Sequence, residues 1–518
     1  MAGVLARWLA TPAMVVVACA GCGGSRAPAT SWVEHDTHYT TTHATTASVP
    51  PVPAALDAAT IDRLDEAGVR AALDRIGDAE PAARLALRAA RLAYHRGDDA
   101  EARAWVARAT SAADEPAVHD ELTELAAALA AAPIEPTKVA VLLPLTGKFS
   151  AIGKELRAAI ELAPAAGTRW MFLDTTGDPE AAGAAVDTAV KQGAVAILGP
   201  VGEREAVSAA RAAAIRGIAI ALLAPGDGAD PAVGVFRLVD SIADEARAVA
   251  RLAARENFPT IGVLVPRDDA GQQAIDALAA EAGRLGVRIT AQGSYDPTGG
   301  KLEADVKAFL GLIPAQNPRL AAHLARHGKN GWTTFSPDVP FTLLYVPDRY
   351  DRAALVAAFL PYFGVELRTT EFPDLAKLQR KHGGHTPQVV QLIGGAGWNH
   401  PSLPVRGGEA VQGALIVDVF AGERGGDIAA ALTTEFRQRT GRDPSSAAAQ
   451  AYDAATLIAN ARNQAAQSPE PRSAIRTALA RATLDDGACG PASIASDGEL
   501  VREPALLEVE DDQLVPAR

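Results

Sequence analysis

Short apolar runs alternate with amphipathic helical stretches over most of the chain, from residue 138 onward. Most of these runs lack polar residues at alternate positions, which is typical of strands that are covered on both faces. Such strands belong to parallel sheets with a helix in each connection, so the pattern predicts an α/β fold. The predicted strands lie at 139–143, 170–173, 195–198, 218–223, 261–265, 287–290, 341–345, 389–393 and 414–417.

Nine such units are more than one sheet conveniently holds, so two sheets in two lobes are the expected arrangement. In open parallel sheets, ligands bind beyond the carboxyl ends of the strands. Loops rich in glycine and proline stand at those ends, and they supply the candidates for a ligand-binding cleft. The candidate cleft residues are Thr146, Lys148, Ser150, Gly202, Glu203, Gly226, Asp227, Asp268, Asp269, Tyr345, Trp398 and Asn399.

The candidates with acidic or aromatic side chains each have a structural alternative. The four carboxylates would make the mouth of a cleft acidic, or they would cap the helices that follow them. The rings of Tyr345 and Trp398 would stack on a ligand, or they would pack into the wall of a lobe.

Residues 54–132 have a different pattern, with no strand-like runs and with alanine and leucine at helical spacing. The stretch from Leu85 to Ala109 is similar to one tetratricopeptide unit: Gly97-Asp marks a turn, and Ala102 and Ala109 let a second helix approach closely. A single clear repeat is also compatible with an ordinary helical bundle. We therefore predict a small all-α, TPR-like module, and we expect the lobes to fold without it.

The first residues are typical of an export signal. An apolar stretch from Trp8 to Ala18 is too short to span a bilayer but fits a secretory signal peptide. Small residues before cysteine resemble a bacterial lipobox, which makes Cys22 the expected lipidation site, with Cys19 as the alternative. Residues 1–22 would then be a lipoprotein signal peptide and 23–53 a disordered, Thr- and Pro-rich tether. Cys489 would be left as a free, buried thiol.

Charge and motif content argue against nucleic-acid binding and catalysis. The net charge of -13 leaves no basic face for a phosphate backbone. The stretch 147–154 has one residue too many for a P-loop, and Glu155 stands where a hydroxyl should hold Mg²⁺. His323 and His327 share a helix face, but Leu324 replaces the catalytic glutamate of a zinc protease motif. We predict a non-enzymatic protein without a metal or cofactor.

Several motifs follow one another in the order of a known family. Lys138-Val-Ala-Val-Leu-Leu-Pro-Leu-Thr-Gly is followed by Ala196-Ile-Leu-Gly-Pro, Val235-Phe-Arg-Leu, Gly397-Trp-Asn and a closing turn at Cys489-Gly-Pro-Ala-Ser. Over about residues 137–515 the chain resembles the leucine-binding family of periplasmic receptors. The resemblance implies a type I periplasmic-binding-protein fold, with two Rossmann-like lobes joined by three crossovers. Lobe one would comprise 137–237 and 417–490, and lobe two 238–416 and 491–515.

The resemblance also bears on the ligand. In amino-acid receptors of the family, hydroxyls and backbone N–H groups from two lobe-one loops hold the α-carboxylate, and an acid from lobe two holds the ammonium. The matching loops at 199–204 and 224–228 carry no hydroxyl, and Ala396 stands where the acid is expected. An unpaired ammonium in a closed cleft costs several kcal/mol, so we expect no tight binding of leucine, isoleucine or valine.

Two functions follow from these patterns. A helical module before such a body resembles the outer-membrane lipoprotein activators of penicillin-binding proteins, a likeness supported by Leu392-Ile-Gly-Gly-Ala-Gly-Trp-Asn. The favoured prediction is therefore a lipoprotein, anchored in the periplasm to the outer membrane, that binds a penicillin-binding protein in peptidoglycan synthesis. The alternative is the substrate-binding component of an ABC transporter for amino acids or another small polar solute, held in the interlobe cleft.

Overall fold

The computed structural model describes residues 57–76, 82–96, 98–111, 116–129, 134–165, 167–226, 228–369, 374–382, 384 and 386–517. The expected signal peptide with Cys22, the tether at 23–53 and the candidate Asp227 lie outside these residues. No helix in the described ranges is long and apolar enough to cross a membrane.

The N-terminal module is all α-helical, as predicted. Helices α3 and α4 form the hairpin expected from the repeat-like stretch, and Ala102 and Ala109, both 0% exposed, lie where the helices meet. Asp57 starts the first helix by accepting a hydrogen bond from the backbone N–H of Thr60. The helices are α1 (Ala58–Asp62), α2 (Glu66–Ile76), α3 (Ala83–Arg96), α4 (Asp99–Ser111) and α5 (Pro116–Leu129).

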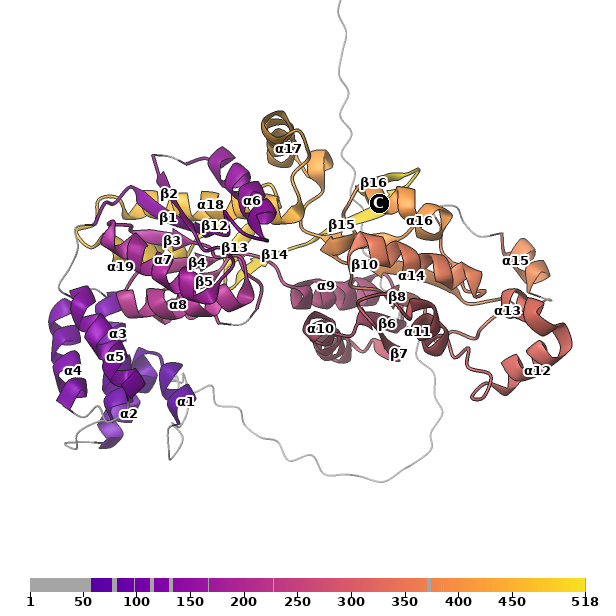
Figure 1. The fold of residues 1–518 in the computed structure, drawn as a ribbon, viewed down its shortest axis with the longest axis horizontal. Coiled ribbons are helices and arrows are strands. Elements are labelled where there is room, and N and C mark those ends of the chain that lie inside the picture. The colour runs from indigo at the N-terminus through magenta and orange to yellow at the C-terminus, as the bar shows by residue number, and fades with distance from the viewer. Residues whose placement is uncertain are drawn as a thin grey trace, which may run out of the picture. The chain divides into compact units, whose positions relative to one another are not determined.

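Lobe one is built on a five-stranded parallel sheet in the order β2-β1-β3-β4-β5. Residues of β1 alternate between two cores: Val139 and Val141 pack with α6, α18 and α19, while Ala140 and Leu142 face α7 and α8. Figure 1 shows this joining of distant segments, with α18 and α19 beside the earlier strands. The first segment contains β1 (Lys138–Leu143), α6 (Ser150–Leu162), β2 (Arg169–Asp174), α7 (Pro179–Lys191), β3 (Ala196–Leu198), α8 (Glu203–Arg216), β4 (Ala219–Leu222), η1 (Pro231–Val233) and β5 (Val235–Arg237).

The second segment of lobe one adds helices and a small antiparallel sheet in the order β12-β13-β14. Ala492 and Leu500 of this sheet are buried in the same core as β1. The segment contains η5 (Gly422–Arg424), α17 (Asp427–Thr440), α18 (Ser446–Ala465), α19 (Pro471–Leu479), β12 (Thr483–Leu484), β13 (Ala492–Ile494) and β14 (Leu500–Arg502).

Lobe two has a larger, mixed sheet in the order β16-β15-β11-β10-β8-β6-β7, with β9 beside β10. The strands of the first segment run parallel, and β15 and β16 add antiparallel pairs at one edge. Its elements are α9 (Ile242–Arg255), β6 (Thr260–Pro266), α10 (Asp269–Leu285), β7 (Arg288–Tyr295), α11 (Leu302–Phe309), α12 (Pro318–His327), η2 (Gly328–Asn330), α13 (Gly331–Thr334), β8 (Leu343–Tyr345), α14 (Tyr350–Tyr362), β9 (Glu366–Leu367), α15 (Leu375–Lys381), β10 (Val389–Gly394), η3 (Ala396–Trp398), α16 (Ser402–Gly407), η4 (Gly408–Val411), β11 (Leu415–Asp418), β15 (Ala505–Glu510) and β16 (Gln513–Pro516).

The chain passes between the lobes three times, after β5, after β11 and after β14. The third passage lies at 503–504, later than the boundary expected at residue 490. The reason is that β13 pairs with β12 and β14, which keeps residues 492–502 in lobe one. Only β15 and β16 return to lobe two.

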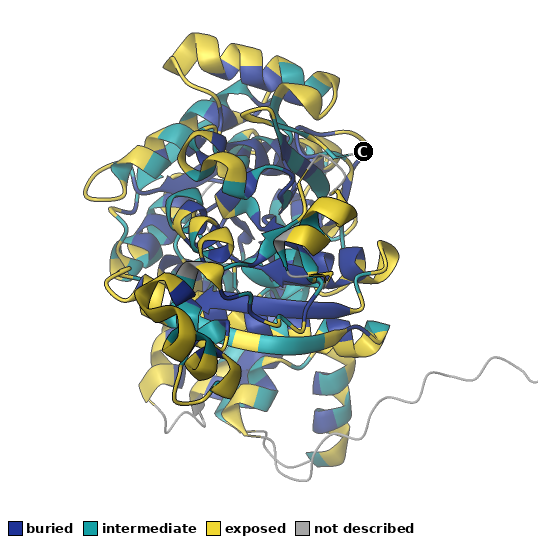
Figure 2. Cartoon of the chain, turned by 90° about the vertical axis from the view of Figure 1, so that its right-hand side faces the viewer, coloured by how far each residue is buried: buried dark blue, intermediate teal, exposed yellow. Residues whose placement is uncertain are grey.

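Burial follows the layered arrangement. Strands are mostly buried, and the outer faces of the helices are mostly exposed, as Figure 2 shows. Each fully buried valine, leucine or isoleucine of these sheets stabilises the fold by about 1.5–3 kcal/mol. Cys489 is the free, buried thiol that the sequence led us to expect.

The helical module shares its core with lobe one. Leu85, Ala89 and Leu92 of α3 belong to the same buried cluster as Ala206 and Ala213 of α8. Polar contacts reinforce this seam between the module and lobe one. Across the seam, Arg211 donates to Glu121, Tyr94 Oη to the Arg216 carbonyl and His95 Nε2 to the Ala214 carbonyl, while Arg91 binds Glu121 within the module.

Candidate functional site

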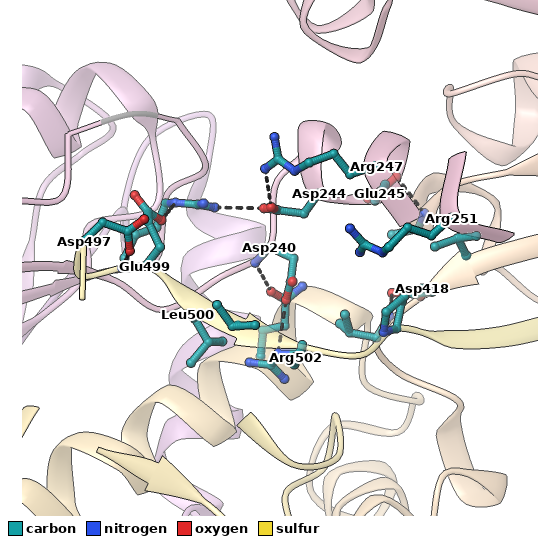
Figure 3. Close-up of a pocket in the computed structure, with 17 residues that line it drawn as sticks. Asp240, Asp244, Glu245, Arg247, Arg251, Asp418, Asp497, Glu499, Leu500 and Arg502 are labelled. Carbon is teal, nitrogen blue, oxygen red and sulfur yellow. Dashed lines mark hydrogen bonds and ion pairs between the residues drawn. The ribbon is translucent and has the colours of Figure 1, made fainter. Parts of the chain in front are cut away.

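A cavity of about 310 Å³ lies between the lobes, beside the three passages of the chain. Lobe one contributes the end of β5, part of α18 and strand β14, while lobe two contributes α9 and the ends of β10 and β11. Figure 3 shows the charged side chains that surround this hinge cavity. Its charged lining residues are Arg237, Asp240, Asp244, Glu245, Arg247, Arg251, Asp418, Asp497, Glu499 and Arg502.

The start of α9 positions one wall of the hinge cavity. Ser241 and Asp244 form a capping box, in which each side chain bonds the backbone N–H of the other. This cap fixes the first turn directly after the passage from lobe one. Glu245, the next residue, is thereby held against the loop that follows β10.

Glu245 is half-buried, and its carboxylate has no cationic partner among the described residues. It accepts a hydrogen bond from the backbone N–H of Ala396, with 3.2 Å between the atoms. Gly395 makes this approach possible, because a Cβ at that position would collide with the carboxylate. Burial, together with the negative charge of Asp418, raises the pKa of Glu245 to about 8.

Asp418 is a second acid of the hinge cavity, and its hydrogen-bond donors are neutral. Ser446 Oγ and Asn399 Nδ2 donate to its carboxylate, the latter at 2.6 Å, as does the backbone N–H of Val419. Burial raises the pKa of Asp418 against the effect of these hydrogen bonds. The hinge cavity thus contains two acids, Glu245 and Asp418, that have no cationic partner in the part of the chain that the structure describes.

The arginines of the hinge cavity, in contrast, all have carboxylate partners. Arg237 pairs with Asp244 at 3.3 Å and with Glu499, while Arg247 pairs with Asp244 at 2.5 Å. The more exposed Arg251 has a longer contact with Glu281, at 3.7 Å. Positive charge in the wall is therefore already matched by acids of the chain.

Arg502 occupies the floor of the hinge cavity, below Asp240 in Figure 3. Its guanidinium lies 3.1 Å from both Asp240 and Asp453, and its side chain is 0% exposed. Nη2 of Arg502 is buried without a hydrogen-bond partner. Burial also raises the pKa of Asp240 to about 6. The floor of the hinge cavity is thus held by two ion pairs of one buried arginine.

The candidates predicted in lobe one lie in two other places. Thr146 donates from its hydroxyl and backbone N–H to Asp174, at 2.5 and 3.2 Å. Lys148 is exposed with its ammonium over the Phe149 ring, and Ser150 begins α6. These contacts shape the loop after β1 and place none of the three residues in the hinge cavity.

The other lobe-one candidates meet at a second cavity, of about 350 Å³. Glu203 and Gly226 line it together with Gln273, which comes from α10 of lobe two. Gly202 is the N-cap residue of α8 beside it. The strands therefore do bring the loops after β3 and β4 together, as expected, at a place separate from the hinge cavity.

The candidates predicted in lobe two have mainly structural contacts. Asp268 caps α10 by accepting from the backbone N–H of Gly271 at 2.9 Å, and Asp269 is the exposed first residue of that helix. Tyr345 and Trp398 are each 0% exposed, so both rings pack into the lobe. Trp398 Nε1 donates to the carbonyl of Val346, and Asn399 binds Asp418.

Sequence reasoning missed most of the hinge cavity. Arg237 lies in the motif Val235-Phe-Arg-Leu, and Ser241 to Glu245 has the pattern of a helix cap, but neither signal marks a ligand site. Glu245 and Arg502 are 257 positions apart in the sequence, so only the folded passages bring them together. The described residues contain no group of three or more metal-ligating side chains that could hold a metal ion.

The fold and the hinge cavity define a two-lobed binding protein, in which three connecting segments join the lobes and a polar cavity lies between them. The family described as periplasmic binding protein matches residues 136–334 and 370–513, and the chain belongs to this family of type I periplasmic binding proteins. The family is one of ligand-binding proteins, and membership places the chain in the periplasm or outside the cell.

Two solved structures with the same fold are described as proteins of ABC transporters. An ABC transporter substrate-binding protein from Sphaerobacter thermophilus is 16% identical with a TM-score of 0.57, over 75% of this chain and 97% of that one. A putative branched-chain amino acid ABC transporter protein from Rhodospirillum rubrum is 17% identical with a TM-score of 0.54, over 74% and 100%.

A third such structure contains an aromatic acid. It is the solute binding protein of an ABC transporter from Rhodopseudomonas palustris BisB5 in complex with 3,4-dihydroxy benzoic acid, 17% identical with a TM-score of 0.51, over 74% and 97%. At identities this low, the likeness to these proteins shows a shared fold and nothing more. No curated protein matches the chain.

Proposed function

We propose that this protein is a solute receptor of an ABC importer, which holds a small polar molecule with a cationic group in the hinge cavity. The observation that carries the proposal is a cavity of about 310 Å³ whose walls come from both lobes. A ligand that contacts both walls binds the closed arrangement better than the open one, and this difference drives closure.

The charges of the hinge cavity favour a cationic group on the ligand. Its arginines are paired with carboxylates, whereas Glu245 and Asp418 have only neutral donors. An ammonium or guanidinium group beside Glu245 would supply the missing positive charge and would lower the pKa of that carboxyl.

Glu245 also changes the expectation for the loop at Ala396. That loop lacks the acid expected from the family resemblance, but the carboxylate of Glu245 reaches its backbone from α9. The missing hydroxyls of the lobe-one loops still leave an α-carboxylate without its usual partners. We therefore keep the prediction that leucine, isoleucine and valine bind weakly, and we favour amines without a carboxylate.

The protein-partner function predicted from the sequence has less support. The similar solved structures come from transport systems and favour the importer over an activator of penicillin-binding proteins. The helical module is a structural feature in favour of a protein partner, since a helical surface suits such binding. A lipid anchor at Cys22 fits either function.

The test is isothermal titration calorimetry with small amines, guanidinium compounds, amino acids and carboxylates. We expect at least one cation to bind the wild-type protein with one-to-one stoichiometry. Glu245→Gln should weaken this binding at least tenfold, while Glu256→Gln, an exposed acid at the end of the same helix, should not. Binding of carboxylates alone, or equal effects of the two variants, would contradict the proposal.

A further inference from the structure

A small cavity of about 180 Å³ lies in the seam between the helical module and lobe one, away from the hinge cavity. Helix α3 contributes one side of it, and the first turns of α19 contribute the other. We call it the seam cavity. The polar side chains that line it and carry the argument are Tyr94, Asp99, Glu470, Arg472, Ser473 and Arg476.

Two arginines of α19 line the seam cavity from the same helix face, since they are four positions apart. Arg472 donates from Nε and Nη2 to the carbonyl of Ala194, at 3.2 and 2.9 Å. Arg476 donates from Nη1 to the carbonyl of Ala232 at 3.0 Å, and its Nε is buried without a hydrogen-bond partner. Neither guanidinium forms an ion pair with any described residue.

Both arginines are half-buried, so water solvates their charges only in part. Burial lowers the pKa of both Arg472 and Arg476, an effect that Tyr94 partly offsets at Arg472 and the charge of Glu66 partly offsets at Arg476. A partly desolvated charge is stabilised when an opposite charge lies beside it. An anion between the two guanidinium groups would provide a negative charge closer to them than the carboxylates at the rim.

The other lining groups suit an anion. Ser473, in the first turn of α19, lines the seam cavity, and Glu470 does not cap that turn with its side chain. Asp99 and Glu470 are both exposed, at the rim. His95 is neutral, because burial lowers its pKa to about 3, and its Nε2 donates to the Ala214 carbonyl.

We propose that the seam cavity is a second binding site, which takes a phosphate, sulfate or carboxylate group between Arg472 and Arg476. A cavity of this size holds the oxyanion and little more of the molecule that carries it. The anion would lie against α3 on one side and α19 on the other, so its binding would strengthen the attachment of the module to lobe one.

The experiment is calorimetry and thermal unfolding of the full chain with sodium phosphate, sulfate, succinate and glycerol phosphate, at an ionic strength held constant with sodium chloride. We expect saturable one-to-one binding and a higher unfolding temperature. Arg476→Gln should weaken binding at least tenfold, and Arg476→Lys should weaken it less. Arg481→Gln removes an exposed charge just beyond α19 and is the matched control.

The outcomes separate this site from the hinge cavity and from simple screening. Equal affinity for phosphate and glycerol phosphate would mean that the site recognises a free oxyanion, and tighter glycerol phosphate binding would mean a group on a larger molecule. Both support the proposal. The proposal would be overturned if Arg476→Gln and Arg481→Gln lost anion affinity equally, or if Glu245→Gln lost anion affinity. It would also be overturned if the wild-type protein showed no saturable anion binding. Arg476→Lys provides the answer if Arg476→Gln does not fold.

Discussion

Replacing Glu245 by glutamine should stabilise the protein at pH 8 and leave its stability nearly unchanged near pH 4.5. Burial and the charge of Asp418 raise the pKa of this carboxyl from 4.5 to about 8 in the folded protein. Glutamine keeps an oxygen that accepts from the backbone N–H of Ala396, but it never ionises. The variant thus removes the titration and retains the contact.

The size of the effect follows from the two pKa values. Between pH 4.5 and 8 the folded protein retains a proton on Glu245 that the unfolded chain has lost, so stability falls as the pH rises. The contribution is fully present below pH 4.5 and is lost by the time the pH passes 8. The loss is about 1.4 kcal/mol for each pH unit, or roughly 3 kcal/mol at pH 7.

Urea unfolding at several pH values between about 5 and 8 measures this difference. The gap in unfolding free energy between Glu245→Gln and wild type should widen steadily with pH. Glu256→Gln, on the same helix with a side chain 51% exposed, is the control and should follow the wild-type profile. A constant gap between Glu245→Gln and wild type over the whole range would refute the reasoning.

Two further predictions concern the hinge and the membrane. Asp453→Asn should lower the free energy of unfolding by about 3 kcal/mol in urea titrations, because it takes a carboxylate from the fully buried Arg502; wild-type stability would show that Asp240 compensates alone. Cys22→Ala should move the protein from the membrane to the soluble periplasmic fraction, and the same shift in Cys19→Ala alone would assign lipidation to Cys19.

The fold could be predicted from the sequence because it depends on local patterns of apolar and polar residues. Continuous apolar runs such as Val139 to Leu143 are buried in the structure at every position, and they predicted parallel strands. The antiparallel edge formed by β15 and β16 was not among the predicted strands. There the burial alternates along Ala505–Glu510, and pairing with β11 depends on a return of the chain that no local pattern marks.

The site was harder to predict because its signals are not local. The loops after the strands were correctly placed at the carboxyl ends, but a loop position does not reveal whether a side chain faces solvent, a cap or a core. Asp268 caps a helix, and Trp398 is completely buried. Glu245, in contrast, lies in the hinge cavity but was not predicted. In the sequence it is an ordinary acid in the first turn of a helix, and only the structure shows its contact with Ala396.

The packing of the helical module argues against the expectation that the lobes fold without it. Leu85 and Leu92 are buried in one cluster with residues of α8, so a chain without the module would expose that face of lobe one to water. Deleting the module would also remove Glu121, the carboxylate that pairs with Arg211. A module bound this closely moves with lobe one, so closure of the lobes on a solute would carry its outer surface along. Lobe one and the module would keep the same contacts with and without solute. A partner that binds the module would therefore have to contact lobe two as well in order to distinguish the two states.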